Sequence, residues 1–162
     1  WVTKGGTLIT VQTGSKWAID KKIINETLKE SQKISLDIPY DQLRTVTGAQ
    51  RIGGAIFKVE IDNTHPIGYG YKNSHSIFRR GTHLFKLSES AAANVARYGK
   101  NPIASGYISE EKLLDMENTA SIIARKKGQG HIILFADNPA FRAFWFGTNG
   151  LLLNAIFFGH VF

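Results

Sequence analysis

The chain contains no cysteine, which excludes disulfides, thiolate metal sites and cysteine nucleophiles. Exported bacterial proteins and cytosolic proteins both tolerate this absence, so it does not identify the compartment. No charged-then-apolar N-terminal leader is visible. No apolar run approaches the roughly 18 residues that indicate a membrane-spanning helix, because Asn149, Gly150 and Asn154 interrupt the apolar C-terminal stretch. We therefore expect no transmembrane segment.

The motifs of the common catalytic sites are absent as well. The sequence has no G-x-S-x-G nucleophile turn, no G-x-x-x-x-G-K-[ST] phosphate loop and no H-x-x-E pair. None of the histidines is followed three or four residues later by a second histidine or a carboxylate, the spacing that places two metal ligands on one helical face. We expect structural or surface roles for all of them and no metal site in this chain: His65, His75, His83, His131 and His160.

Charge of one sign is in excess but is not concentrated. The formal net charge is +7, from 20 basic and 13 acidic residues. The basic residues are spread along the chain, and even the cluster at residues 125–127 is short. A surface that binds nucleic acid should gather its positive charge on one face. We therefore interpret these residues as an ordinary solvated surface and predict no nucleic-acid partner.

Length and composition favour one globular unit. The 162 residues are 43% hydrophobic and 11% aromatic, enough to bury one sizeable core. No internal repeat or low-complexity tract is visible. We predict a single domain over residues 1–162.

Residue patterns predict alternating strands and helices in the first half of the chain. A Gly5-Gly6 cap should end a helical turn and lead into a buried strand over residues 7–11. Ser15 is a suitable N-cap for an amphipathic helix over residues 16–33. Residues 35–54 are polar and rich in glycine, so they predict a long surface connection. Because Trp1 stands where the last turn of a helix is expected, we interpret the chain as a fragment; a natural start with a short irregular arm is the alternative.

The second half favours a mixed sheet. Residues 55–62 alternate apolar and polar side chains, as a strand exposed on one side does. Ser109 should cap a short helix that ends near Met116. Glycines in the turn at residues 126–130 predict a C-terminal β-hairpin. The other expected strands are short and cover residues 76–79, 83–87, 95–98, 105–108, 119–125 and 131–136.

The stretch from His131 to Phe158 organises the chain. It begins with an apolar, β-branched strand buried on both faces and ends in a helix over residues 148–158 that stops at Gly159. Between them lie an Asp-Asn-Pro turn and a loop with four aromatic residues. Ligands of open α/β sheets often bind at such a turn. We predict a binding site formed by Asp137, Asn138, Arg142, Phe144, Trp145 and Asn149.

An alternative interpretation of the same stretch is structural. Most of the aromatic rings would then pack in the core, and Arg142 would pair with Asp137. Asp137 and Asn138 would bond nearby backbone amides and fix the turn. Aromatic faces and a guanidinium plane also suit a sugar or a peptide, so both interpretations stay open.

Two segments resemble a known family. Residues 1–9 resemble the helix-to-strand step of class I glutamine amidotransferase-like domains, which have a flavodoxin-like α/β fold. Residues 130–139 and 141–149 resemble the C-terminal end of that domain as it is appended to bacterial zinc carboxypeptidases of the carboxypeptidase A superfamily. Residues 61–66 and 104–108 also fit. The resemblance covers most of the chain, and its C-terminal motif is the most specific part.

The resemblance implies a flavodoxin-like sheet with flanking helices that lacks its N-terminal strands. Zinc carboxypeptidases of this kind are metallopeptidase hydrolases that hold zinc with an H-x-x-E pair and a distant histidine. No H-x-x-E occurs here, so the zinc and the peptidase domain would lie upstream in a parent chain. Amidotransferase activity needs a cysteine nucleophile, which is absent. The resemblance thus implies a non-catalytic accessory domain of a bacterial enzyme that is periplasmic or secreted.

Four functions follow as hypotheses. The first is an accessory domain that stabilises the peptidase or presents peptide or cell-wall substrate. The second is a carbohydrate- or peptidoglycan-binding module that uses Asp137, Arg142, Phe144 and Trp145. The third is an oligomerisation domain, because an incomplete sheet exposes strand edges that can pair with another copy. An independent enzyme is the fourth, and no complete catalytic set supports it.

Overall fold

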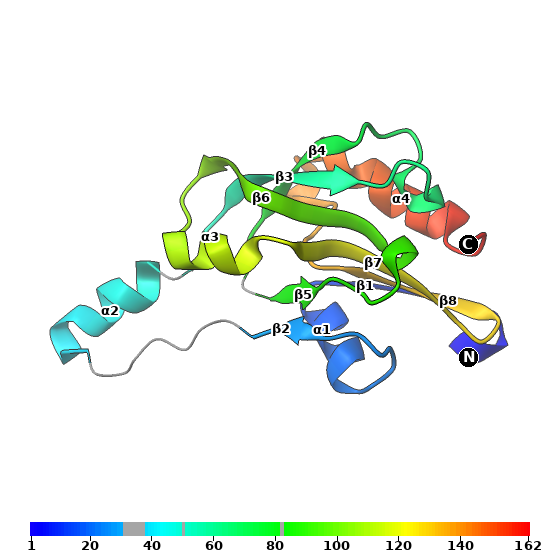
Figure 1. Ribbon diagram of the computed structural model, residues 1–162, viewed down its shortest axis with the longest axis horizontal. Coiled ribbons are helices and arrows are strands. Elements are labelled where there is room, and N and C mark those ends of the chain that lie inside the picture. Colours follow the sequence, from blue (N-terminus) through cyan, green and yellow to red (C-terminus); the bar gives the residue numbers. More distant parts are fainter. Residues whose placement is uncertain (31–37, 50, 82) are drawn as a thin grey trace.

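The computed structural model describes residues 1–30, 38–49, 51–81 and 83–162. These residues form a mixed α/β structure, in which helices flank one curled, open sheet (Figure 1). The helices are α1 (Thr13–Asp20), α2 (Tyr40–Ala49), α3 (Glu110–Met116) and α4 (Asn149–Phe158). The strands are β1 (Thr7–Val11), β2 (Leu28–Lys29), β3 (Ala55–Ile61), β4 (Ser74–Arg79), β5 (Leu84–Lys86), β6 (Asn94–Gly106), β7 (Thr119–Lys127) and β8 (Gly130–Phe135). The predicted α/β class is confirmed.

The main path of the sheet runs β1-β8-β7-β6-β3-β4. Strand β5 pairs with β7 off this path, and β2 pairs with β5. Only the β1–β8 pair is parallel among the described strand pairs, and the remaining pairs are antiparallel. The sheet is therefore mixed, as predicted, with its antiparallel part dominant.

The N-terminal turn and β1 confirm the predicted glycine cap. A short 3₁₀ helix, Val2–Lys4, ends at Gly5, whose φ of 111° lies in the left-handed region that favours glycine. Strand β1 follows and lies parallel to β8, with Thr7 opposite His131. The strand is only half-buried along most of its length.

The prediction of a helix over residues 16–33 is wrong beyond Asp20. Helix α1 begins at Thr13, and Ser15 lies inside it instead of capping it. The Ser15 hydroxyl is buried and donates to the Phe135 carbonyl oxygen at 3.0 Å, which ties the first turn to the sheet. Lys22 has a positive φ of 54°, so the chain leaves the helix and returns to the sheet as β2. Residues 31–33 lie outside the described part of the chain.

The predicted surface connection over residues 35–54 contains a helix. Helix α2 follows Pro39, whose carbonyl oxygen accepts from the Leu43 amide, and none of the helix residues is buried. The helix does carry apolar residues at helical spacing, Tyr40, Leu43, Val46 and Ala49, although none of them is buried. Apart from the buried Ile52, the described part of the segment is exposed or half-buried, as a surface connection should be. Residues 35–37 and 50 lie outside the described residues.

The middle strands fit the alternation in the sequence, with one difference. Strand β3 buries every second side chain from Ala55 to Ile61, as predicted. Strand β6 is one long strand where two short ones were expected. Register shifts against β3, between Tyr98 and Ser105, let it continue past Pro102, because a bulge absorbs residues that do not fit the ladder. Ile108 lies outside the strand.

The C-terminal elements confirm their predictions. The Ser109 hydroxyl caps α3 by accepting from the Lys112 amide at 3.4 Å. Strands β7 and β8 form the antiparallel hairpin, and Gly128 in its turn has a φ of 63°. Every residue of β8 is buried. Helix α4 ends before Gly159.

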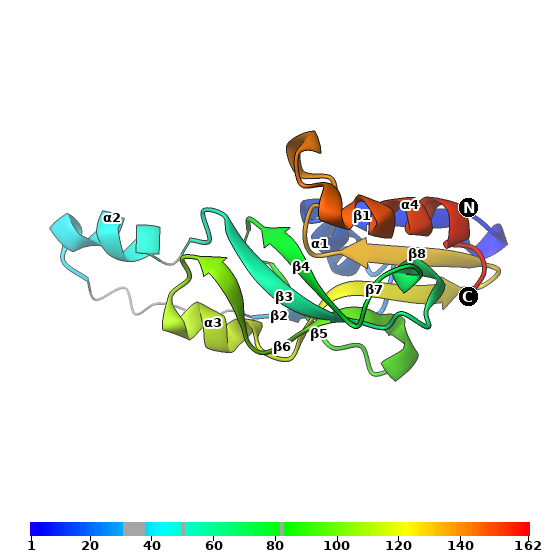
Figure 2. The same ribbon diagram turned by 90° about the horizontal axis from the view of Figure 1, so that it is seen from above.

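Helices cover the two faces of the sheet at the β1–β8 end. Helix α4 lies on one face, where Leu151 and Ala155 pack with Ile133 and Phe135 of β8 (Figure 2). Helix α1 lies on the other face, where Ala18 joins a second apolar cluster with Ile132. No helix in the described part of the chain is both long enough and apolar enough to cross a membrane.

Candidate functional site

The carboxylate of Asp137, at the end of β8, is turned into the protein. Its Oδ1 accepts from Arg79 Nη1 of β4 at 2.7 Å, and its Oδ2 accepts from the hydroxyls of Tyr98 and Ser121. Arg79 is 1% exposed and also donates to the His83 carbonyl oxygen. We call these four side chains, Arg79, Tyr98, Ser121 and Asp137, the Asp137 network.

The network explains why a charged pair is stable in the core. Burial by itself would lower the pKa of Arg79, but the negative charge of Asp137 raises it above its usual value. Burial raises the pKa of the Tyr98 hydroxyl, and the same carboxylate raises it further. Tyr98 therefore stays a neutral hydrogen-bond donor and Arg79 a cation. The predicted pairing of Arg142 with Asp137 is wrong, because Arg79 takes that place.

Asn138 and Thr148 hold the turn that follows β8. The side-chain oxygen of Asn138 accepts from the Ala140 amide at 3.0 Å, as an Asx turn does. The buried Thr148 hydroxyl donates to the Pro139 carbonyl oxygen at 2.6 Å. The expectation that Asn138 bonds a nearby backbone amide is confirmed. For Asp137 that expectation is wrong, since its partners in the network are side chains.

The aromatic loop, residues 141–146, divides its rings between the protein and solvent. Phe78 of β4 contacts the rings of Phe141 and Trp145 at centroid distances of 4.5 and 6.2 Å. Phe144 also approaches Phe78, but it is 56% exposed, and Phe146 is 70% exposed. The alternative that most of these rings pack in the core is wrong, because none of the four is buried: Phe141 and Trp145 are half-buried, and Phe144 and Phe146 are exposed.

The backbone of this loop is held in an unusual conformation. Arg142 and Ala143 have φ values of 50° and 52°, a left-handed region that costs energy for residues other than glycine. The Arg142 guanidinium lies over the Phe141 ring at 5.3 Å. This bend brings Phe141, Phe144 and Trp145 together around Phe78 and leaves one side of the cluster open to solvent.

Two polar atoms near the loop have no hydrogen-bond partner among the described residues. They are the indole Nε1 of Trp145, a donor, and the Oδ1 of Asn149, an acceptor. Buried polar atoms of this kind are usually satisfied. The predicted site thus splits. Asp137 and Asn138 serve the fold, whereas Arg142, Phe144, Trp145 and Asn149 belong to a segment in which two buried polar atoms lack a partner among the described residues.

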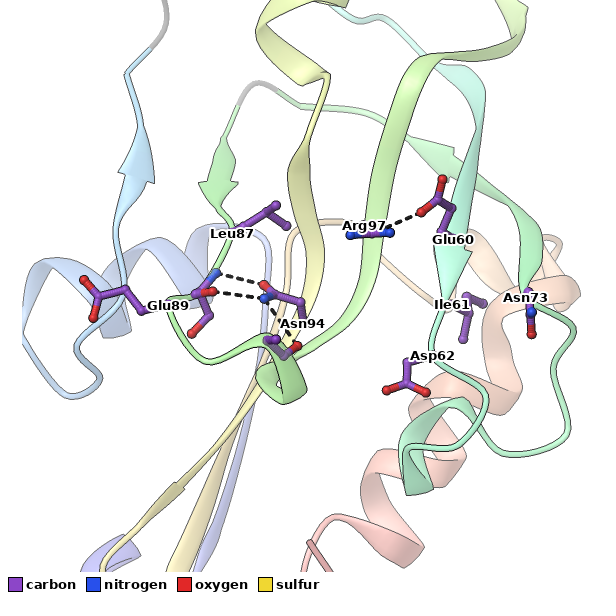
Figure 3. Close-up of a pocket in the computed structure, with 10 residues that line it drawn as sticks. Glu60, Ile61, Asp62, Asn73, Leu87, Glu89, Asn94 and Arg97 are labelled. Carbon is purple, nitrogen blue, oxygen red and sulfur yellow. Dashed lines mark hydrogen bonds and ion pairs between the residues drawn. The ribbon is translucent and has the colours of Figure 1, made fainter.

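The sequence did not predict an open cavity of about 630 Å³, which is lined by residues of β3, of β6 and of the segment that connects β5 to β6 (Figure 3). Glu60 and Arg97 lie opposite each other on these strands and form an exposed ion pair of 2.8 Å. Asp62 accepts from the Thr64 hydroxyl at 2.6 Å, and this bond lowers its pKa, so its carboxylate stays ionised. The polar lining comes from Glu60, Asp62, Asn73, Ser88, Glu89, Asn94 and Arg97.

The sequence carried only part of the signal for this cavity. The alternation in β3 predicts that Glu60 and Asp62 point away from the core, and they do. Nothing in the pattern pairs Glu60 with Arg97, because that contact depends on the register between β3 and β6. Chemically, the cavity suits a polar ligand that carries a positive charge and donates hydrogen bonds.

Among the described residues, no group of three or more histidine, aspartate or glutamate side chains is placed so that it could hold a metal ion. Burial lowers the pKa of His65, against an opposing effect of Asp62, and burial also lowers that of His83. Of the remaining histidines, His131 is buried and hydrogen-bonded to the Phe162 carbonyl oxygen, and His75 is hydrogen-bonded to the Gly147 carbonyl oxygen. His160 is exposed. Comparison of the chain with protein-family models and with curated proteins gave no match.

Proposed function

We propose that the chain is an accessory domain of a larger, exported bacterial zinc carboxypeptidase, and that it contributes substrate presentation or stability without supplying a catalytic group. The flavodoxin-like, class I amidotransferase-like assignment is part of this proposal. It is supported by the resemblance of residues 130–149 and by the parallel β1–β8 pair with helices on both faces. Zinc would belong to the upstream peptidase domain.

The observation that carries the proposal is the inward orientation of Asp137. In open α/β sheets, ligands bind outside the carboxyl ends of the strands, and Asp137 is the acidic residue at that position after β8. Its two oxygens accept hydrogen bonds from three buried side chains, so they support the fold. The most specific part of the resemblance therefore has a structural task.

The cavity on β3 and β6 supports substrate presentation. Three acidic residues, Glu60, Asp62 and Glu89, are among the residues that line it, together with Asn73 and Asn94. A peptide amine or a lysine side chain would find charge and hydrogen-bond acceptors there. Its volume, about 630 Å³, lies in the range of small-ligand sites.

Two measurements test the proposal. Incubating the chain with C-terminal peptide substrates and zinc should give no turnover, and robust turnover would contradict it. Titrating the chain with a short lysine-containing peptide should show binding that Glu60→Gln weakens about fivefold, the effect of one exposed charge pair. Glu110→Gln, an exposed change on α3, is the matched control and should leave binding unchanged. Reading the parent gene for an upstream H-x-x-E domain completes the test.

A second candidate function, binding of carbohydrate or peptidoglycan, is favoured by the unpartnered atoms of the aromatic loop. Trp145 Nε1 and Asn149 Oδ1 are a buried donor and a buried acceptor, which a sugar would reach only if the loop with the exposed Phe144 ring and Arg142 moved to uncover them. Sugars need this combination, since an aromatic face covers their apolar side and polar atoms bond their hydroxyls.

Tryptophan fluorescence tests this candidate. Trp1 and Trp17 are both at least half exposed, so Trp1→Phe and Trp17→Phe would be introduced first to leave Trp145 as the reporter. Peptidoglycan fragments should then change the emission, and Phe144→Ala should weaken the response. Tyr107→Ala, at an exposed aromatic residue outside the loop, should not. A flat titration would remove this function.

A further inference from the structure

Helix α4 is apolar on the side that faces away from the sheet. Leu153, Ile156 and Phe157 follow one another at the spacing of a single helical stripe, and each is more than half exposed. Beside this stripe, Tyr69, Phe158 and Val161 line an open hollow of about 450 Å³. The Tyr69 and Phe158 rings meet edge to face at 6.4 Å. We call these six residues the α4 apolar face.

Helices α1 and α3 do not share this feature. The exposed side of α1 carries Lys16 and Asp20, which form an ion pair, and α3 begins with Glu110 and Glu111. A helix that is apolar all round is normally buried on all sides. Only Leu151 and Ala155 of α4 are fully buried against the sheet. The outer side of α4 therefore has the composition of a helix covered by a further layer.

The size of the face fits a protein interface. The six side chains are 41–70% exposed, and at about 200 Å² for a whole large apolar side chain they leave roughly 600 Å² uncovered. Patches on monomeric proteins rarely exceed about 300–600 Å², and a standard interface buries about 800 Å² on each partner.

The charge pattern indicates which partner binds the α4 apolar face, a membrane surface or a second copy of the chain. From Ala143 to Phe162 the sequence has no Asp, Glu, Lys or Arg. A helix that lies on an anionic membrane carries Lys and Arg on its polar side, and α4 has none. Two copies of a chain with a net charge of +7 repel each other over most of their surfaces. They can approach here, where no like charges meet.

We propose that the α4 apolar face binds the same face of a second copy, so that the chain forms a symmetric dimer. In a two-fold interface each patch meets itself, which requires a surface that is complementary to its own copy. The α4 apolar face offers a protruding side chain and a recess side by side. The Phe157 ring, 63% exposed on the stripe, enters the hollow beside Phe158 and Tyr69 of the other copy. This contact is distinct from pairing of free sheet edges, which would involve β1 or β4.

Light scattering coupled to gel filtration tests the dimer on the complete 162-residue chain. At roughly 100 μM, where a dimer with a low micromolar Kd is mostly formed, we expect twice the 18.0 kDa mass of one chain. Leu153→Glu should raise the dimer Kd at least about 30-fold, the size of an interface hot spot. Phe157→Ala should weaken the dimer in the same direction.

The matched control is Leu114→Glu on α3. Leu114 is 66% exposed and Leu153 is 51% exposed, so both variants put the same charge on an exposed helical leucine. Leu114→Glu should remain dimeric, and circular dichroism should show that both variants fold. A monomeric wild-type chain at this concentration overturns the proposal. A dimer that survives Leu153→Glu also overturns it and assigns the contact to the sheet edges.

Discussion

The turn after β8 and the aromatic loop that follows it are neighbours in sequence, but their side chains lie in opposite environments. Asp137, the most polar residue of the turn, has its carboxylate enclosed by Arg79, Tyr98 and Ser121. Phe144 and Phe146, among the most apolar residues of the loop, are largely exposed. The difference shows that burial depends on the neighbours that the fold supplies. Arg79, which is buried at the end of β4, pairs with the Asp137 carboxylate, whereas the rings of Phe144 and Phe146 remain largely in solvent.

The largest expected effect on stability comes from removing the buried carboxylate of Asp137. Asp137→Ala leaves the Arg79 cation in the core without its partner, and such a loss costs about 3–5 kcal/mol of unfolding free energy. Urea unfolding followed by circular dichroism measures it. The double variant Arg79→Met with Asp137→Leu removes both charges and should recover most of the loss. A single variant within about 1 kcal/mol of wild type would show that the network is not structural.

A smaller loss is expected when one neutral hydroxyl of the network is removed, that of Tyr98, which donates to Asp137 and accepts from Arg79 Nη1 at 3.3 Å. Tyr98→Phe keeps the buried ring and deletes the hydroxyl that donates to Asp137, which should cost about 1–2 kcal/mol. The same urea experiment applies. Tyr107→Phe makes the identical change at an exposed ring and should have no measurable effect. Equal behaviour of the two variants would contradict the role of Tyr98.

A weaker, pH-dependent effect is expected at His65, a half-buried residue that lines the hollow beside α4. Burial lowers the pKa of His65 below its ordinary value of 6.5 in the folded chain. The unfolded chain then binds the proton more readily, so this contribution to stability is present above pH 6.5 and is lost as the pH falls through the folded pKa. Stability measured between pH 7 and 5 should fall less steeply in His65→Gln. The exposed His160→Gln serves as control and should keep the wild-type slope; an unchanged slope in His65→Gln would refute the assignment.

The smallest effect is expected at the exposed rings of the loop. Phe146→Ser removes a side chain that the protein hardly covers, so thermal or urea unfolding should change by no more than about 0.5 kcal/mol. Phe135→Ala, in the same stretch but on the buried strand β8, should cost about 3–5 kcal/mol. If the two variants lost similar stability, the loop would be part of the core after all.

Local features of the site were predictable, and contacts between distant residues were not. The Asx turn at Asn138 follows from a short polar side chain placed two residues before a free amide, which is a local property. The partner of Asp137 is Arg79, 58 residues earlier, and no sequence pattern near either residue predicts this contact. The nearer cation, Arg142, was the natural choice from sequence, but the left-handed bend at Arg142 and Ala143 carries it over Phe141 instead.

Local signals in the sequence suffice to predict five features: the glycine cap before β1, the alternation in β3, the Ser109 cap of α3, the β7–β8 hairpin and the Gly159 end of α4. Each depends on backbone preferences and side-chain spacing within a few residues. Only the tertiary structure decided where α1 stops, that β6 is one strand, and which side chains of the last stretch turn inward. Those outcomes depend on strand register and on long-range partners, and the free energy of such contacts exists only when the whole sheet is assembled.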